Sequence, residues 1–368
     1  MKLIIPLFTI LMSCYRPAYS AELLEIETLA SGLGVPWGMA IMPDHKLLIS
    51  QREGQLSLLD LDSGSITDIT GLPAIKVAGQ GGLFDVALSP DYSNTPWIYL
   101  SYSKAISGKG ATTLSRAKLV GNALIDWQDL LVTKSITGTN YHFGGRITFD
   151  DKNHVFLSVG ERGVRPNAQD LTTHAGSILR LNLDGSVPAD NPFVCNNKVL
   201  PEIWSYGHRN PQGLFFNNYT QQLWAIEHGP RGGDEINLIA AGKNYGWPII
   251  SYGMEYYREV PVGQGTEQIG MEQPIKRFVP SIAPSSIIQY TGVLFPEWHN
   301  NLLAGALKLQ HLNRIVLDNH NQVVSETRLL RDIKGRIRNI IESPEGWLYV
   351  STDNGRILKI SPHLADNE

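Results

Sequence analysis

Residues 337–361, IRNIIESPEGWLYVSTDNGRILKIS, contain the unit that decides the fold. Its apolar runs are short and end in turns rich in Pro, Glu, Asp, Asn and Gly, which is typical of β-strands joined by tight turns. The predicted strands span residues 337–342, 347–352 and 356–361, with a turn at Pro344. The stretch therefore predicts one antiparallel β-unit.

The same unit recurs five more times along the chain. In each copy an apolar stretch is followed by a turn, a strand, a second turn and another strand. The first turns of these copies lie at positions 43, 90, 150, 217 and 296. The apolar stretches and strands span residues 46–50 and 55–61; 84–88 and 97–103; 146–149, 154–160 and 177–183; 213–216, 222–228 and 234–239; and 292–295, 301–307 and 314–318.

Six such units predict an all-β fold, a six-bladed β-propeller of four-stranded antiparallel blades. Units of about 40 to 50 residues, plus insertions, account for the chain from residue 21 onward. Residues 23–29 are expected to add a strand to the last blade and so close the ring. No long segment has the 3.6-residue period of an amphipathic helix, which argues against alternating strands and helices. A pair of β-sandwiches is the alternative, but it predicts no similarity between units.

The first 20 residues read as a signal peptide for export to the periplasm. Lys2 precedes an apolar run at 3–12, and small residues at 18–20 flank the expected cut before Ala21. The run is too short to span a membrane. The segment that ends at Cys14 also resembles a lipoprotein signal, in which this cysteine would be acylated.

Residues 21–368 are then expected to form a single propeller domain. A hydrophobic content of 42% is enough for a substantial core. Loss of Lys2 and Arg16, and of no acid, takes the formal net charge from −4 to about −6. This charge gives no indication of nucleic acid or an anionic membrane as a partner. Cys195 is the cysteine that remains, so no internal disulfide is expected.

Residues 207–248 are unusually rich in Gly, Pro and charge. They contain GHRNPQG at 207–213, EHGPRGGDEIN at 227–237 and KNYGWP at 243–248. Core strands rarely use this composition, because glycine weakens a strand and proline lacks a backbone donor. We therefore expect loops shaped around a ligand in this region.

Polar residues also lie close to the predicted innermost strands of several blades. Loops at one end of a propeller channel converge, so such residues can face one ligand. The candidates are Gln80, His142, Arg209, Asn210, Lys308, Arg336 and Arg338. Four cations suit an anion with several carboxylates, because arginine binds a planar carboxylate through two N–H groups. His142 is the candidate for proton transfer.

The same residues also have structural explanations. A lone histidine in a β-protein is most often a satisfied structural group, and Arg336 and Arg338 could be alternate residues on a solvated strand face. Their recurrence at equivalent blade positions favours a shared site. Motifs for other chemistries are missing from the sequence: residues 79–82 match no dinucleotide fingerprint, and there is no P-loop, GxSxG, HExxH or paired-cysteine motif.

Eight ordered blocks of the chain resemble the soluble quinoprotein aldose sugar dehydrogenases of the glucose/sorbosone dehydrogenase superfamily. Two of them are the blocks at 227–237 and 243–248 quoted above. The others are PWGMAIMPD (36–44), GQGGLFDVALSPDY (79–92), HFGGRITFD (142–150), EIWSYGHRNPQGL (202–214), GALK (305–308) and RIRNIIESPEGWLYVSTD (336–353). The resemblance covers essentially the whole chain after residue 20. That family folds as a six-bladed propeller, in agreement with the count of units.

The resemblance implies oxidation of an aldose at its anomeric carbon to the lactone. The implied cofactors are pyrroloquinoline quinone (PQQ), which takes the hydride, and calcium, which holds the quinone. An external electron acceptor would then reoxidise the quinone. By the family's motifs, His142 is the general base, and the cofactor is bound by Gln80, Arg209, Asn210, Lys308, Arg336 and Arg338.

The resemblance also implies metal ligands. The backbone carbonyls of Gly229 and Pro230 match those that hold the calcium ion at the cofactor, and Glu235 and Tyr245 match ligands of a further calcium site. Without the resemblance, Glu235 reads as a surface charge on a strand, and Tyr245 with Trp247 as a packed aromatic turn.

Two positions depart from the glucose-oxidising branch of the family. Tyr141 stands where that branch has Asp, and Val279 where it has Trp, which places the chain closer to the broad-specificity aldose branch. Two other functions stay open. A calcium-dependent lactonase or esterase would need acidic and Asn ligands that converge at the channel. A non-enzymatic propeller that presents its face to a protein or glycan would require neither His142 nor the cations.

Overall fold

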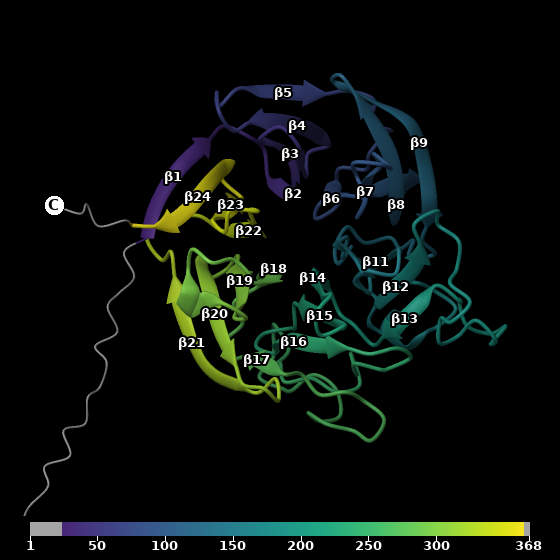
Figure 1. Cartoon of the computed structure of the whole chain (residues 1–368). Helices are drawn as coiled ribbons and strands as arrows, with labels where there is room; N and C mark the ends of the chain where they lie inside the picture. The colour runs from purple at the N-terminus through teal and green to yellow at the C-terminus, as the bar shows by residue number, and fades with distance from the viewer. Residues whose placement is uncertain (1–23, 364–368) are drawn as a thin grey trace, which may run out of the picture.

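The computed structural model describes residues 24–363, in which 24 strands form six four-stranded antiparallel sheets around a central channel (Figure 1). The prediction of a six-bladed β-propeller is confirmed. The predicted signal peptide, residues 1–20, and the possible acylation site at Cys14 lie outside the described residues. Within residues 24–363, no helix combines the length and the apolar character needed to cross a membrane.

The blades follow the chain in order. The first three blades contain β2 (Pro36–Met42), β3 (Lys46–Gln51), β4 (Gln55–Asp60) and β5 (Ile66–Ile69); β6 (Leu83–Leu88), β7 (Ile98–Ile106), β8 (Lys109–Val120) and β9 (Ala123–Val132); and β10 (Ile147–Phe149), β11 (His154–Val159), β12 (Ser177–Asn182) and β13 (Ile203–Tyr206). The next two contain β14 (Pro211–Asn217), β15 (Gln222–Glu227), β16 (Asp234–Ile239) and β17 (Lys276–Phe278); and β18 (Pro284–Gln289), β19 (Leu302–Ala306), β20 (His311–Leu317) and β21 (Val323–Leu329). Short 3-10 helices span Arg165–Gln169 and Pro296–Trp298.

The sixth blade joins the two ends of the described chain. It combines β22 (Ile337–Glu342), β23 (Leu348–Thr352) and β24 (Arg356–Pro362) with β1 (Leu24–Ala30), which pairs antiparallel to β24. The expected closing strand at residues 23–29 is therefore confirmed. This pairing covers the edge that β24 would otherwise expose, and it holds the ring shut without a covalent link.

The fifth blade corrects one prediction. Residues 292–295 were expected to be its innermost stretch, but that strand is β18, and residues 292–295 belong to the loop that enters the Pro296–Trp298 helix. The loop is held by Tyr290, whose hydroxyl accepts the N–H of Phe295 at 3.2 Å and donates to the carbonyl of Gly346 at 2.6 Å. The apolar side chains of this loop are used for packing rather than for strand pairing.

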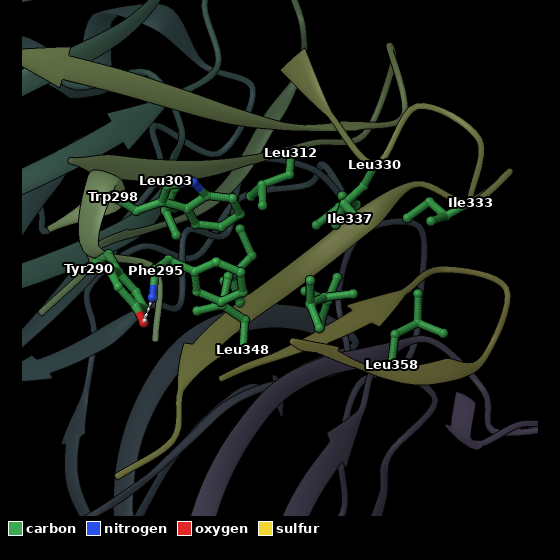
Figure 2. Close-up of a cluster of buried hydrophobic side chains, with 13 residues drawn as sticks. Tyr290, Phe295, Trp298, Leu303, Leu312, Leu330, Ile333, Ile337, Leu348 and Leu358 are labelled. Carbon is green, nitrogen blue, oxygen red and sulfur yellow. Dashed lines mark hydrogen bonds between the residues drawn. The ribbon is translucent and has the colours of Figure 1, made fainter. Parts of the chain in front are cut away.

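That packing forms a buried cluster between the fifth and sixth blades (Figure 2). The rings of Phe295 and Trp298 are stacked with centroids 4.2 Å apart. The labelled aliphatic members come from both blades and from the loop between them: Leu303, Leu312, Leu330, Ile333, Ile337, Leu348 and Leu358. Large aromatic and aliphatic residues bury enough apolar area to hold two separate sheets together.

A ring of side-chain hydrogen bonds links each blade to the next. No strand of one blade pairs with a strand of its neighbour within residues 24–363, so these bonds add to the apolar packing that fixes the blades relative to one another. Each donor bonds a carbonyl at or near the beginning of the next innermost strand. The donor and acceptor pairs are Ser50 and Phe84, Ser101 and Gly145, Ser158 and Pro211, His228 and Pro284, Ser285 and Ile337, and Ser351 and Pro36.

A buried ion pair lies at the centre of this ring. Arg146 donates to the Asp85 carboxylate at 2.9 Å, and both side chains are almost fully buried. Arg146 also donates to the carbonyl of Gln212 at 3.0 Å, and its guanidinium lies 4.2 Å from the ring centroid of Trp37. One side chain thus contacts the innermost strands of the first, second and fourth blades from the start of the third.

We expect loss of this pair to destabilise the ring. Asp85→Asn leaves Arg146 buried without its counter-ion, so the free energy of unfolding in urea should fall by about 3 kcal/mol. The control Asp62→Asn removes a carboxylate whose side chain is 80% exposed, and it should change that free energy by less than about 0.5 kcal/mol. Equal stability of Asp85→Asn and the wild type would show that the pair is dispensable.

Candidate functional site

A cavity of about 110 Å³ opens at the end of the channel where the innermost strands begin. Four predicted site residues meet in it: Gln80, Asn210, Arg336 and Arg338. The rest of its lining is Trp37, Arg52, Phe84, Phe143, Gly144, Gln212, His228 and Leu307. Residues from all six blades or the loops that lead into them therefore contribute to one cavity.

The two arginines of the sixth blade share a carboxylate. Asp353, directly after β23, accepts from the Nε–H groups of Arg336 and Arg338, each at 2.8 Å. Burial opposes ionisation of Asp353, but Arg338 and Arg336 outweigh it and hold the pKa of this carboxyl below its usual value. Arg338 is 6% exposed, so the explanation of a solvated strand face is wrong for it. The sequence reasoning missed Asp353, although it ends the quoted block at 336–353.

His142 lies beside the cavity in a backbone conformation with φ of +55°. Its N–H donates to the side-chain oxygen of Gln80 at 2.8 Å, and its Nδ1 lies 2.5 Å from Oε1 of Glu161. An ionised carboxylate can only accept, so Nδ1 carries the proton and the lone pair of Nε2 is left to accept another. Glu161 was not predicted from the sequence. It follows Gly160, and a Cβ atom added at that glycine would lie only 2.2 Å from the carbonyl oxygen of His142.

Burial sets the charge of His142. It lowers the pKa of this imidazole from its ordinary value of 6.5, Glu161 acts in the opposite direction, and Arg209 adds to the lowering. A neutral imidazole held by a carboxylate can take a proton and then be stabilised as the cation. The pair therefore consists of an imidazole and a carboxylate that orients it.

Arg162 holds the loop that carries His142. It is fully buried, and its guanidinium lies 3.5 Å from the ring centroid of Phe143. It donates to the carbonyls of Gly110, Ser135, Thr139 and Tyr141. Tyr141 and Phe143 flank His142, so the bond to the Tyr141 carbonyl and the contact with the Phe143 ring hold the residues on both sides of the imidazole. No sequence pattern pointed to this role.

Arg209 and Asn210 connect this cavity to a smaller one. The backbone N–H of Arg209 donates to Glu227 at 2.7 Å, and its guanidinium donates to the carbonyl of His228 at 3.2 Å. The side-chain oxygen of Asn210 accepts the N–H of Gly144 at 3.3 Å. Burial lowers the pKa of His228 to about 3, so this ring is neutral where it borders both cavities.

The structure does not place the predicted residue Lys308 in the cavity. Its side chain is exposed beyond β19, and among the residues that the structure describes it lines neither of these cavities. The backbone is nevertheless close, because the preceding Leu307 lines the larger cavity.

All four predicted metal-site residues line the smaller cavity, which has a volume of about 20 Å³. They are Gly229, Pro230, Glu235 and Tyr245, and Glu227 joins them. The Tyr245 hydroxyl is already used, since it donates to Leu238 at 2.6 Å and accepts from Ala240 at 2.9 Å. The hydroxyl is therefore not free to bind an ion, which leaves the carbonyl oxygen as the other oxygen of this residue.

Two carboxylates face each other at this cavity. Glu235 on β16 is the register partner of Glu227 on β15. Burial, and then the charge of Glu227, raise the pKa of Glu235 to about 8. Like charges opposite each other destabilise a sheet, and oxygen donors of this kind suit calcium. Within residues 24–363 no three His, Cys, Asp or Glu side chains form a metal cluster, so an ion here would also need carbonyl oxygens.

Comparison with known proteins identifies relatives along most of the chain. The sequence model of the family described as Glucose / Sorbosone dehydrogenase matches residues 33–359. The aldose sugar dehydrogenase YliI of Escherichia coli is 40% identical over 347 residues, which cover 92% of this chain and 93% of the relative.

Solved structures give the same result. The apo-form of the soluble aldose sugar dehydrogenase from Escherichia coli superimposes with a TM-score of 0.89 at 38% identity, over 93% of this chain and 100% of that one. The PQQ-bound form of an aldose sugar dehydrogenase from Streptomyces coelicolor has a TM-score of 0.75 at 27% identity, over 92% of this chain and 98% of that one.

The contact between His142 and Glu161 leads to a prediction about proton affinity. Glu161→Gln removes the charge that favours the imidazolium, so the pKa of His142, followed by NMR titration, should fall further below 6.5. The control Glu202→Gln removes the carboxylate 3.2 Å from His174, and it should leave the pKa of His142 unchanged. A His142 pKa that is equal in Glu161→Gln and the wild type would contradict the pairing.

Proposed function

The chain belongs to the glucose/sorbosone dehydrogenase family, an oxidoreductase family, and we propose that it oxidises aldose sugars to lactones with PQQ as cofactor and His142 as general base. The observation that carries the proposal is the neutral His142 and its partner Glu161 beside a cavity of arginine and amide donors. The PQQ-bound relative from Streptomyces coelicolor supports the choice of cofactor.

The residues of the larger cavity and its border fit a planar anion with several carboxylates. Arg336 and Arg338 supply charged N–H groups, which form the strongest bonds to carboxylates. Within residues 24–363 the buried Nε–H of Arg209 has no hydrogen-bond partner, so it remains a donor for a ligand. Trp37 and Phe143 add flat apolar surface that suits an aromatic ring.

The chemistry follows from the charges of these side chains. Oxidation of an anomeric alcohol requires removal of its hydroxyl proton as the C–H bond breaks. Neutral His142 takes that proton at Nε2, while Glu161 holds the tautomer and stabilises the imidazolium that results. PQQ, when bound, supplies the hydride acceptor. The guanidinium of Arg209 stabilises negative charge that develops nearby.

Calcium is the second part of the proposal. The carbonyl oxygens of Gly229 and Pro230 would hold the ion at the cofactor, and Glu235 with the Tyr245 carbonyl a further ion. The support is the placement of these four residues around one small cavity, and the raised pKa of Glu235 in the absence of a counter-charge. A divalent cation would offset the repulsion between Glu235 and Glu227.

Export and the final acceptor belong to the same proposal. Residues 1–20 predict delivery to the periplasm, with Cys14 as an alternative lipid anchor. An external electron acceptor would be needed for repeated turnover. Tyr141 and Val279 stand where the glucose-oxidising branch has Asp and Trp, so we expect the protein to accept sugars other than glucose.

One experiment separates this function from its rivals. The purified protein, with calcium, should bind PQQ and reduce a redox dye when an aldose is added. A calcium-dependent lactonase or esterase would instead hydrolyse lactones without quinone, and a binding propeller would do neither. Absence of PQQ binding and of sugar-dependent dye reduction would refute the proposal.

His142 provides the decisive variant. His142→Ala should lower kcat by about 10² to 10⁴ while PQQ still binds, because only the proton acceptor is lost. In the wild type, kcat/KM should fall as the pH drops through an inflection below 6.5, since burial lowers the pKa of the base. The exposed His299 serves as control, and His299→Ala should keep full activity. Full activity of His142→Ala would exclude it as the base.

Calcium binding leads to a stability prediction. At a free concentration of 100 times the dissociation constant, calcium should stabilise the chelator-treated protein by about 2.7 kcal/mol. Glu235→Gln should lose the part of this effect that comes from the ion at Glu235. Glu272→Gln is the matched control, because Glu272 pairs with Lys243 at 2.9 Å and is not part of the small cavity's lining among the described residues. If calcium stabilised Glu235→Gln as much as the wild type, Glu235 would not be a calcium ligand.

A further inference from the structure

Both carboxylate oxygens of Asp353 accept hydrogen bonds from the two arginines of the cavity. Its Oδ1 accepts from Nε of Arg338 at 2.8 Å, and its Oδ2 accepts from Nε of Arg336 at 2.8 Å and from a terminal N–H of Arg338 at 3.0 Å. Its backbone N–H donates to the carbonyl of Arg336 at 2.9 Å. The side chain of Asp353 is only 15% exposed, so solvent replaces few of these bonds.

These contacts decide which N–H groups a ligand can meet. Arginine has five N–H groups in a fixed planar fork. Asp353 takes the Nε edge of Arg336, which leaves both terminal nitrogens of Arg336 for the cavity. It takes Nε and one terminal nitrogen of Arg338, which leaves the other terminal nitrogen. Both guanidiniums are thus held at one edge and open at another.

The two guanidiniums would otherwise repel each other. Arg336 directly precedes β22 and Arg338 is its second residue, and both guanidiniums bond the same carboxylate, so the two positive charges lie close together. Burial lowers the pKa of the Arg146 guanidinium, and the positive charge of Arg338 adds to this lowering. Asp353 is the carboxylate that bonds the first two, and Asp85 is the one that bonds Arg146.

We propose that Asp353 is a positioning residue for the anionic cofactor, which it serves by holding Arg336 and Arg338 in their binding arrangement before the ligand arrives. The inference rests on the proposed function. Asp353 has two opposing effects on binding, because its charge repels an anion while its hydrogen bonds remove the need to order two flexible side chains. Because Asp353 is largely buried, salt screens its charge only weakly. The two guanidiniums that it bonds already offset this charge, so we expect order to be the effect that decides affinity.

The test is the dissociation constant of PQQ, measured by titration of the calcium-loaded protein at low and high salt. Asp353→Asn should raise it about tenfold at both, the lower end of what loss of an orienting partner costs in metal sites. Asp353→Glu keeps the charge but moves the carboxylate, so it should also raise the constant. Glu259→Gln, which removes a carboxylate that is 91% exposed, should leave it within about twofold.

A double-mutant cycle separates positioning from general destabilisation. If Asp353 acts through the arginines, Asp353→Asn should raise the dissociation constant by a smaller factor in an Arg336→Gln background than in the wild type. The same factor in both backgrounds would overturn the inference, and so would unchanged or tighter binding by Asp353→Asn. A wild type that does not bind PQQ would refute the proposed function, and the inference with it.

Discussion

The cavity depends on the hydrogen bonds between neighbouring blades. Strands of different blades do not pair within residues 24–363, yet the cavity takes side chains from all around the ring. Six side-chain donors, five serines and His228, fix each blade to the start of the next innermost strand. Arg146 adds contacts across the centre with Asp85, Gln212 and Trp37. Because these bonds lie at the end of the channel where the cavity opens, they set its shape.

The junction between the fourth and fifth blades is the one where histidine replaces serine. His228 donates from Nε2 to the carbonyl of Pro284, and its burial keeps the ring neutral. The same ring borders the larger cavity and the smaller one. A residue that holds two blades together thus also separates the proposed cofactor site from the proposed ion site. The imidazole ring of His228 is large enough to border both cavities, whereas a serine side chain at this junction would be too small.

The polar groups of the site follow one rule. Several groups expected to meet the ligand or substrate have a carboxylate partner that fixes them: Glu161 for His142, Asp353 for Arg336 and Arg338, and Glu227 for the backbone of Arg209. Buried charges are stable only when paired, so the partners are needed for folding as well as for orientation. The proposed activity would therefore use side chains whose positions are set before any ligand binds.

The sequence by itself determined the number of blades and the closing strand, because strand periodicity and turn composition are local properties. It also pointed to four of the twelve residues that line the larger cavity. It misplaced the innermost strand of the fifth blade, since residues 292–295 have a strand-like composition but pack as a loop. Only the tertiary structure decided that Lys308 stays outside and that Glu161, Asp353 and Arg162 support the site. Their roles come from contacts between residues 15 or more positions apart in the chain, and no local pattern records which distant side chains a folded ring brings within hydrogen-bond reach.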